Sequence, residues 1–179
     1  MTQTAELERG PDQSGSLKAY KSLLRGADRV SYVVIVAVMT AMACLVSIQV
    51  FYRYALSSSI DSADELSRLF FVWAIFLAIP HGVKYGVHVG IDLIVRLMPL
   101  RWQEGMFRLS AGLSALLMVV TLAVSWTATV DKWPELMPTM PVTAALFYIP
   151  VLISAGHSFL HLIALLWGGS ATWAGENEL

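Results

Sequence analysis

Two long stretches of the sequence, residues 30–52 and 109–130, contain no charged residue. A helix of about 20 apolar residues spans the hydrocarbon core of a bilayer, which is roughly 30 Å thick. Either stretch is long enough to cross it. Charged residues make up only 14% of the 179 residues, whereas soluble domains carry about 25%. We therefore predict an all-α integral membrane protein.

Hydropathy and charge predict one membrane domain, residues 17–168, with four transmembrane helices. The spans are expected at about residues 30–54, 64–83, 107–130 and 143–167. Residues 1–16 are predicted to be a disordered tail and residues 169–179 a second polar tail. From Leu17 the sequence has an apolar face and a basic face, which predicts a short amphipathic helix at the membrane surface. The first apolar run is too long for a cleavable signal peptide, so we expect it to remain as an anchor.

Lysine and arginine are distributed unevenly between the polar segments. Five precede the first span and four lie between the second and third, whereas the first and third loops have only Arg53 and Lys132. Cytoplasmic segments of membrane proteins carry the excess of these residues. We therefore expect the N-terminus and the middle loop in the cytoplasm. Four spans then place the C-terminus there as well.

The segment between the second and third spans is not a simple polar loop. Residues 89–98 are largely apolar, and Asp92 and Arg96 are spaced i,i+4, so they can pair on one helical face. Pro99 then interrupts the segment. We predict an interfacial amphipathic helix over residues 89–98.

Four charged residues flank the first predicted hairpin. Arg53 ends the first span, and Asp64, Glu65 and Arg68 begin the second. Charges at this depth are costly unless they are paired or hydrated. The structural interpretation is a network in which Asp64 pairs with Arg68 and Glu65 with Arg53 or a partner protein. The functional alternative is a relay for an ion or a substrate.

Two histidines, His157 and His161, are spaced i,i+4 on one face of the fourth span. They could bind a metal or haem, but the ligands of a b-type haem normally come from different helices. The other histidines, His81 and His88, lie near or beyond the end of the second span. We therefore favour hydrogen bonds from His157 and His161 to a neighbouring helix.

The sequence lacks the motifs of a nucleotide-binding loop, a hydrolase nucleophile or a metalloprotease. Its one cysteine, Cys44, can form neither an internal disulfide nor a cysteine-based metal site. We also find no discontinuous helix pair of the kind that builds the substrate site of secondary transporters. We expect no enzymatic activity, no cofactor, no metal and no nucleic-acid partner.

The order of several short motifs resembles the small membrane subunit of tripartite ATP-independent periplasmic (TRAP) transporters. That family has an Arg-Tyr pair ending the first span, an acidic pair beginning the second, a tryptophan within it and a histidine-to-aspartate stretch after it. The matching residues here are Arg53, Tyr54, Asp64, Glu65, Trp73, His88 and Asp92. The resemblance covers about residues 28–168. Ser62 and Ala78 depart from it, since tryptophan and glycine are common at those places.

The resemblance implies a scaffold role in the inner membrane of a bacterium. A periplasmic binding protein would deliver an organic acid to a complex of a large subunit and this small one. The large subunit would bind the substrate and sodium or another coupling ion, and would move as an elevator. The small subunit would brace it within the lipid bilayer. Structural or interface roles would then fall to Arg53, Asp64, Glu65, Arg68, Trp73, His88 and Asp92.

Two other functions stay open on the residues alone. A membrane-anchored redox subunit would need His157 and His161 to bind haem. A self-sufficient small exporter usually needs a carboxylate within an early span, and residues 30–52 contain none.

Overall fold

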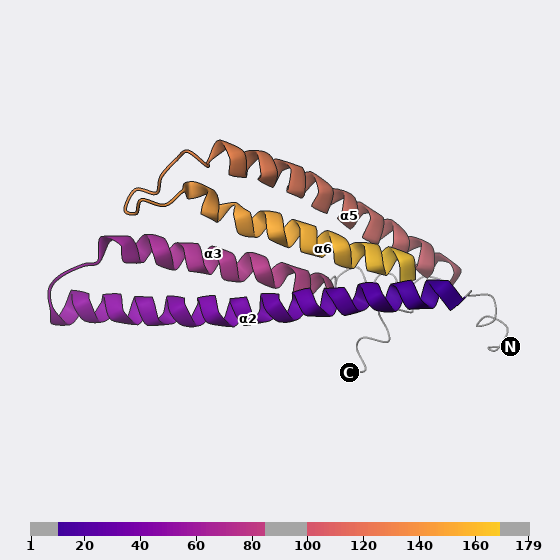
Figure 1. The fold of residues 1–179 in the computed structure, drawn as a ribbon, viewed down its shortest axis with the longest axis horizontal. Helices are drawn as coiled ribbons and strands as arrows, with labels where there is room; N and C mark the ends of the chain where they lie inside the picture. Colours follow the sequence, from indigo (N-terminus) through magenta and orange to yellow (C-terminus); the bar gives the residue numbers. More distant parts are fainter. Residues whose placement is uncertain (1–10, 85–99, 169–179) are drawn as a thin grey trace.

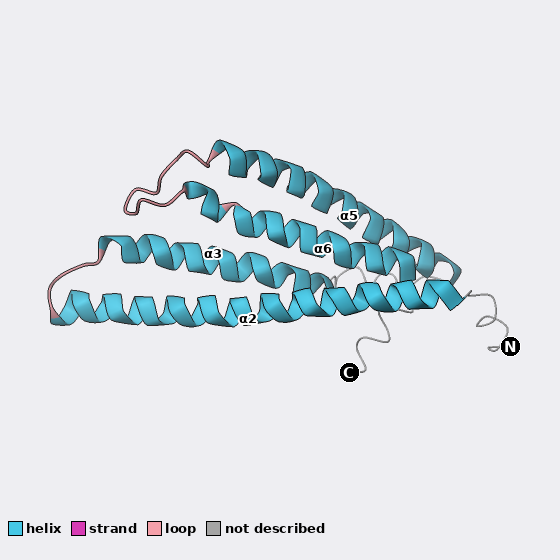
Figure 2. Cartoon of the chain, in the orientation of Figure 1, coloured by secondary structure: helices cyan, strands magenta, loops and turns pink. Residues whose placement is uncertain are grey.

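The computed structural model describes residues 11–84 and 100–168, and nearly all of them are helical. The long helices are α2 (Pro11–Ala55), α3 (Asp61–Lys84), α5 (Leu100–Asp131) and α6 (Ile149–Gly168), and a 3₁₀ helix, η1 (Ala144–Phe147), precedes α6 (Figures 1 and 2). No strand occurs in the described ranges, and four helical segments are long and apolar enough to cross a membrane. The predicted all-α class with four spans is confirmed.

The first helix differs most from the prediction. The membrane-capable segments are Ser22–Ala55, Asp61–Val83, Arg108–Asp131 and Ala144–Leu166. The last three begin and end within a few residues of the expected positions. The predicted surface helix from Leu17 is instead the beginning of α2, which is continuous from Pro11. The prediction of a separate helix was wrong, because no proline or glycine pair interrupts the helix between the basic segment and the apolar run. The predicted interfacial helix, residues 89–98, lies outside the described residues.

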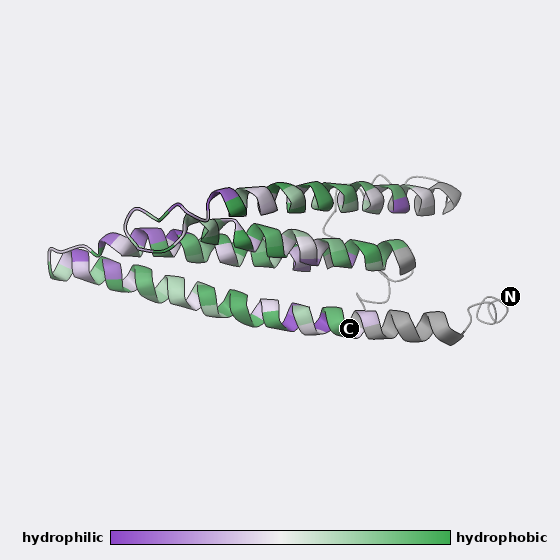
Figure 3. Ribbon diagram, turned by 45° about the horizontal axis from the view of Figure 1, so that its top comes forward, coloured by the Kyte–Doolittle hydropathy of each residue, from purple (hydrophilic) through white to green (hydrophobic). Residues whose placement is uncertain are grey.

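The four helices form an open row instead of a closed bundle. The order across the row is α2, α3, α6 and α5 (Figure 1), and the extensive contacts join only neighbours in that row. Figure 3 shows that hydrophobic residues occur along all of these helices. Helices α2 and α5 therefore form the two edges. Most of the exposed large apolar side chains lie on these two helices. A helix that exposes apolar residues along its length needs lipid or another protein to cover it.

Small residues line the contacts between the helices. The buried hydrophobic residues include Ala63, Ala74, Ala145 and Ala155, and the largest side chains that are fully buried are only two prolines and a serine. A Cβ atom added at Gly156 of α6 would lie 3.4 Å from Leu122 of α5. Small residues let helix backbones approach closely, and such packing stabilises helix pairs where lipid removes the hydrophobic driving force.

A proline near the end of α3 is accommodated by the neighbouring helix. Pro80 is buried inside α3 and has no N–H to donate to the carbonyl of Phe76. One residue further on, the carbonyl of Leu77 accepts a hydrogen bond of 3.1 Å from the buried hydroxyl of Ser31 in α2. Hydroxyl groups of adjacent helices commonly bond backbone carbonyls near prolines within membranes.

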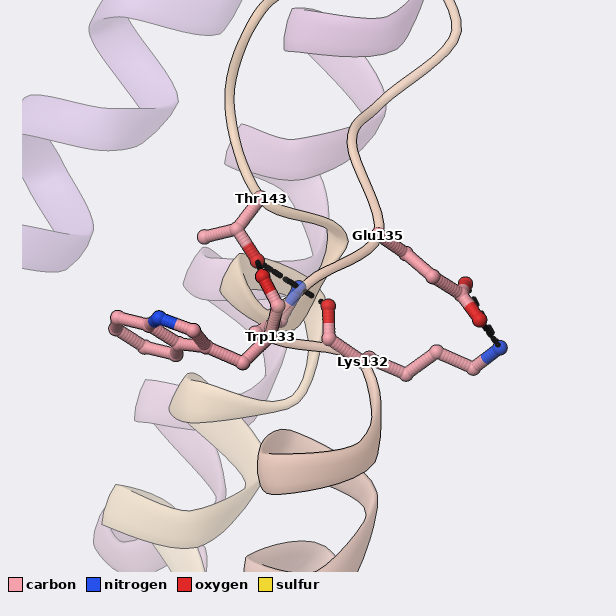
Figure 4. Close-up of polar contacts among 5 residues, drawn as sticks. Lys132, Trp133, Glu135 and Thr143 are labelled. Atoms are coloured by element: carbon pink, nitrogen blue, oxygen red, sulfur yellow. Dashed lines mark hydrogen bonds and ion pairs between the residues drawn. The ribbon is translucent and has the colours of Figure 1, made fainter.

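The loop between α5 and η1 is held by a dense set of hydrogen bonds. Thr143 donates to the carbonyl of Trp133 at 2.9 Å and accepts from the N–H of Ala145 at 3.1 Å, and it caps η1 (Figure 4). Lys132 and Glu135 form an ion pair of 2.7 Å, and this hydrogen bond raises the pKa of Lys132. The loop is therefore a defined structural element beside the ends of α3 and α6.

Candidate functional site

A carboxylate and two imidazoles from two helices meet inside the row. Nε2 of His161 lies 2.9 Å from Oδ1 of Asp28 in hydrogen-bond geometry, and Nε2 of His157 lies 3.0 Å from the same oxygen. The second contact has the distance of an ion pair but not the direction of a hydrogen bond. Asp28, His157 and His161 are all buried, with exposed fractions of 7%, 9% and 6%. We call these three residues the Asp–His cluster.

The Asp–His cluster connects helices that otherwise have few contacts. Asp28 belongs to α2, which packs mainly on α3, whereas both histidines belong to α6. The histidine rings lie with their centroids 4.9 Å apart, on one face of α6. His81 of α3 lies edge-on to His157, with 6.4 Å between the ring centroids. The cluster therefore lies where three helices meet, toward the end of the row at which α2 begins. We call this the N-terminal end of the row.

A second contact joins α2 to α6 at the N-terminal end. The hydroxyl of Tyr20 donates a hydrogen bond of 2.8 Å to the carbonyl of Leu160. Partial burial raises the pKa of Tyr20 above its ordinary value of 10.0, so the hydroxyl keeps its proton at neutral pH. Together with the Asp–His cluster, this bond holds the first helix against the last.

We expect Tyr20→Phe to destabilise the domain by about 1 kcal/mol, the usual net worth of one hydrogen bond. Tyr32→Phe is the matched control, because Tyr32 lies on the same helix and is 63% exposed. Raised folded pKa values favour the protonated form, so the Tyr20 contribution is complete below pH 10.0 and is lost as pH rises through the folded value. Unfolding by detergent at neutral pH measures the difference. Equal stability of the two variants would contradict the assignment.

Sequence reasoning did not identify Asp28. Asp28 precedes the uncharged run that begins at residue 30 and falls within the segment predicted to be a surface helix. The available signal was an acidic residue among arginines, beside a span, with a histidine pair elsewhere in the chain. The predicted hydrogen bond from the histidine pair to a neighbouring helix is confirmed for His161. The argument against an exporter needs correction, since the segment Ser22–Ala55 does contain the carboxylate of Asp28.

At the opposite end of the row, contacts join α3 to the loop before α6. Glu65 accepts two hydrogen bonds from Thr139, one from the backbone N–H at 3.0 Å and one from the hydroxyl. The indole N–H of Trp73 donates to the carbonyl of Leu146 in η1 at 3.0 Å. We call these the loop-end contacts. They connect the hairpin of α2 and α3 to the hairpin of α5 and α6.

The predicted ion-pair network at the first hairpin was wrong in its partners. Asp64 accepts a hydrogen bond of 2.7 Å from Gln49 of α2, and Glu65 bonds Thr139. Within the described ranges, neither Arg53 nor Arg68 forms an ion pair with Asp64 or Glu65, and both arginines are exposed. Exposed ion pairs gain little energy, whereas the N–H and hydroxyl of one threonine supply two aligned donors to one carboxylate. Two further candidates, His88 and Asp92, lie outside the described residues.

The fold defines a multi-pass membrane protein. The Asp–His cluster and the loop-end contacts lie at the two ends of the row, and four helical segments are apolar enough to cross a membrane. Over residues 42–172 the chain matches the family described as the DctQ component of tripartite ATP-independent periplasmic transporters. The chain belongs to this family, which is a transporter component and not an enzyme. The resemblance drawn from the motifs is confirmed.

Two similar proteins are named as TRAP transporter permeases. The isethionate TRAP transporter permease protein DctMQ of Oleidesulfovibrio alaskensis is 29% identical over 58% of this chain and 18% of its own length. A protein of Haemophilus influenzae named as a TRAP transporter small permease is 27% identical over 44% of this chain and 49% of its own length. The matched region thus spans less than half of either relative.

Proposed function

We propose that this chain is the stationary small subunit of a TRAP transporter and braces a large membrane subunit that carries out transport. In this proposal the large subunit takes up an organic acid, driven by sodium or another coupling ion. A periplasmic binding protein delivers the acid. The complex lies in the bacterial inner membrane, with both ends of this chain in the cytoplasm, as the distribution of lysine and arginine favours.

The open row of helices is the observation that supports this role most strongly. Among the described residues, no further helix packs on the outer sides of α2 and α5, and both helices expose many large apolar side chains. Such an edge can pack against another membrane protein over its full length. The relative DctMQ is a fusion of the two kinds of subunit, which supports direct association with a large subunit.

The polar contacts at both ends of the row support a rigid role. The Asp–His cluster connects α2 to α6 at one end, and Glu65 and Trp73 connect α3 to the following hairpin at the other. Relative movement of the two hairpins would break these hydrogen bonds. A subunit built this way suits a fixed support better than a moving carrier.

The exposed arginines at the first hairpin are proposed contacts of the partner. Arg53 and Arg68 carry charge at the loop end without an ion-pair partner among the described residues. In this proposal, a carboxylate of the large subunit or of the binding protein forms an ion pair with each of these arginines. His88 and Asp92 keep their proposed interface role from the motif resemblance.

Co-purification tests the proposal. A large subunit encoded in the same genome carries the affinity tag, and this chain is expected to elute with it in a fixed ratio. Uptake into vesicles is expected to need both subunits and the binding protein. A chain that runs alone and transports an organic acid alone would contradict the proposal.

Thiol labelling locates the contact edge in the same complex. Cys44 lies exposed on the edge formed by α2, and a Leu117→Cys, Cys44→Ser variant places the thiol on the edge formed by α5, where Leu117 is 60% exposed. We expect the large subunit to protect one of the two thiols from a membrane-permeant maleimide. If both thiols were labelled as fast in the complex as without the large subunit, neither α2 nor α5 would pack against that subunit at these positions.

A further inference from the structure

The Asp–His cluster has the composition and spacing of a metal site. One ligand atom from each of Asp28, His157 and His161 lies within 4.8 Å of the other two, and all three residues are buried. Imidazole nitrogen with carboxylate oxygen is a common ligand set for zinc, which binds nitrogen at about 2.0–2.1 Å and oxygen at about 2.0–2.2 Å. Two histidines spaced i,i+4 on a helix present their rings on the same face, as in many zinc sites.

The direction of the His157 ring supports a shared ligand better than a simple hydrogen bond. Its Nε2 atom lies 3.0 Å from Oδ1 of Asp28 but, unlike Nε2 of His161, forms no hydrogen bond of regular geometry. Around a tetrahedral zinc ion, ligand atoms lie about 3.3 Å apart, and each points at the ion and not at its neighbour. Separations of 2.9 and 3.0 Å therefore need to widen by only a few tenths of an ångström.

Charge balance at this position also favours a cation. A buried carboxylate within a membrane domain is costly unless it is paired or binds a metal. A divalent ion would bring positive charge to the buried carboxylate of Asp28. His81 of α3 lies beside His157 and can serve as a fourth ligand or support the site from outside. A nitrogen-rich set selects zinc and its neighbours over magnesium or calcium.

We propose that Asp28, His157 and His161 bind one Zn²⁺ ion, which fastens α2 to α6 at the N-terminal end of the row. Helix α2 otherwise packs mainly on α3, so the ion would supply a direct connection between the first and last helices. The site is structural, and it does not depend on the proposed transport role.

Metal titration of the purified full chain tests the proposal. The chain carries a tag without histidines and the Cys44→Ser change, because that exposed thiol can bind zinc on its own. After treatment with a chelator, Zn²⁺ is added, and bound metal is counted by mass spectrometry. We expect one Zn²⁺ per chain, a raised melting temperature, and no effect of Mg²⁺. With Co²⁺ in place of Zn²⁺, the absorption bands of a tetrahedral site are expected.

His157→Gln is the decisive variant. It keeps the hydrogen bond between His161 and Asp28, so the domain is expected to fold, but it removes one ligand. We expect a loss of affinity larger than the roughly 10- to 100-fold that removal of an outer-shell partner costs, with the Co²⁺ bands abolished. Asp64→Asn, which alters an exposed carboxylate of α3, is the control and is expected to bind as the parent does. Absence of stoichiometric zinc in the parent, or equal zinc in His157→Gln, would overturn the proposal.

Discussion

Replacing Asp28 with alanine is expected to destabilise the membrane domain by about 2 kcal/mol. Removing one partner of a buried ion pair costs about 3–5 kcal/mol in soluble proteins. Interhelical hydrogen bonds within membranes average only about 0.6 kcal/mol, with a maximum near 1.7. Asp28→Ala falls between these values, because it removes the acceptor of the buried His161 imidazole but leaves no isolated negative charge.

The loss of stability is expected to be concentrated at the beginning of α2. Without Asp28, the hydrogen bond from Tyr20 to Leu160 is left to hold the beginning of α2 against α6. Hydrogen exchange of residues 22–31 should therefore accelerate more than exchange in α5. Asp131→Ala, at the exposed end of α5, is the matched control. If both variants unfold at the same detergent concentration, the buried cluster does not stabilise the domain.

Glu65→Ala is expected to have the second large effect, again about 2 kcal/mol. The carboxylate accepts two hydrogen bonds from Thr139, and bonds to charged groups contribute about 1.5–3 kcal/mol each when buried. Glu65 is half-buried and Thr139 is exposed, so we expect the two bonds together to contribute about 2 kcal/mol, less than twice the lower end of that range. The same variant should weaken assembly with the large subunit, because the third loop is no longer held beside α3.

Three companion variants make this prediction specific. Asp64→Ala changes the neighbouring exposed carboxylate and should cost little. Glu65→Gln keeps an acceptor and should fall between Glu65→Ala and the parent. A double-mutant cycle of Glu65→Ala with Thr139→Val should give a coupling energy of about 1 kcal/mol. Additive effects of those two changes would show that the hydrogen bond to the hydroxyl does not stabilise the loop end.

The number and type of the spans could be predicted from the sequence because lipid imposes length and apolarity directly. The uncharged runs at residues 30–52 and 109–130 are sufficient to identify two of them. The start of α2 could not be predicted as well. Its basic segment satisfies the pattern of a surface helix, and the hydrogen bonds of Tyr20 and Asp28 to α6, which hold this segment beside the last helix, cannot be read from a local pattern.

The pairing of polar groups was harder to predict than the helices. Spacing along one helix suggested Asp64 with Arg68, yet Asp64 bonds Gln49 and Glu65 bonds the backbone of a loop 74 residues away. The bond from His161 to Asp28 joins residues 133 positions apart. Such partners depend on the order of helices across the row, and no local pattern in one sequence specifies that order.

Cross-linking the two hairpins tests the central claim that this subunit does not move during transport. Cysteines replace Glu65 and Thr139, whose side chains are in direct contact, in the Cys44→Ser background. A short, cleavable bifunctional thiol reagent then joins them in the assembled transporter. Uptake of the acid bound by the cognate binding protein is measured before cross-linking, after it, and after cleavage. We predict that uptake persists in the cross-linked complex. Uptake that stops on cross-linking and returns on cleavage would contradict the account.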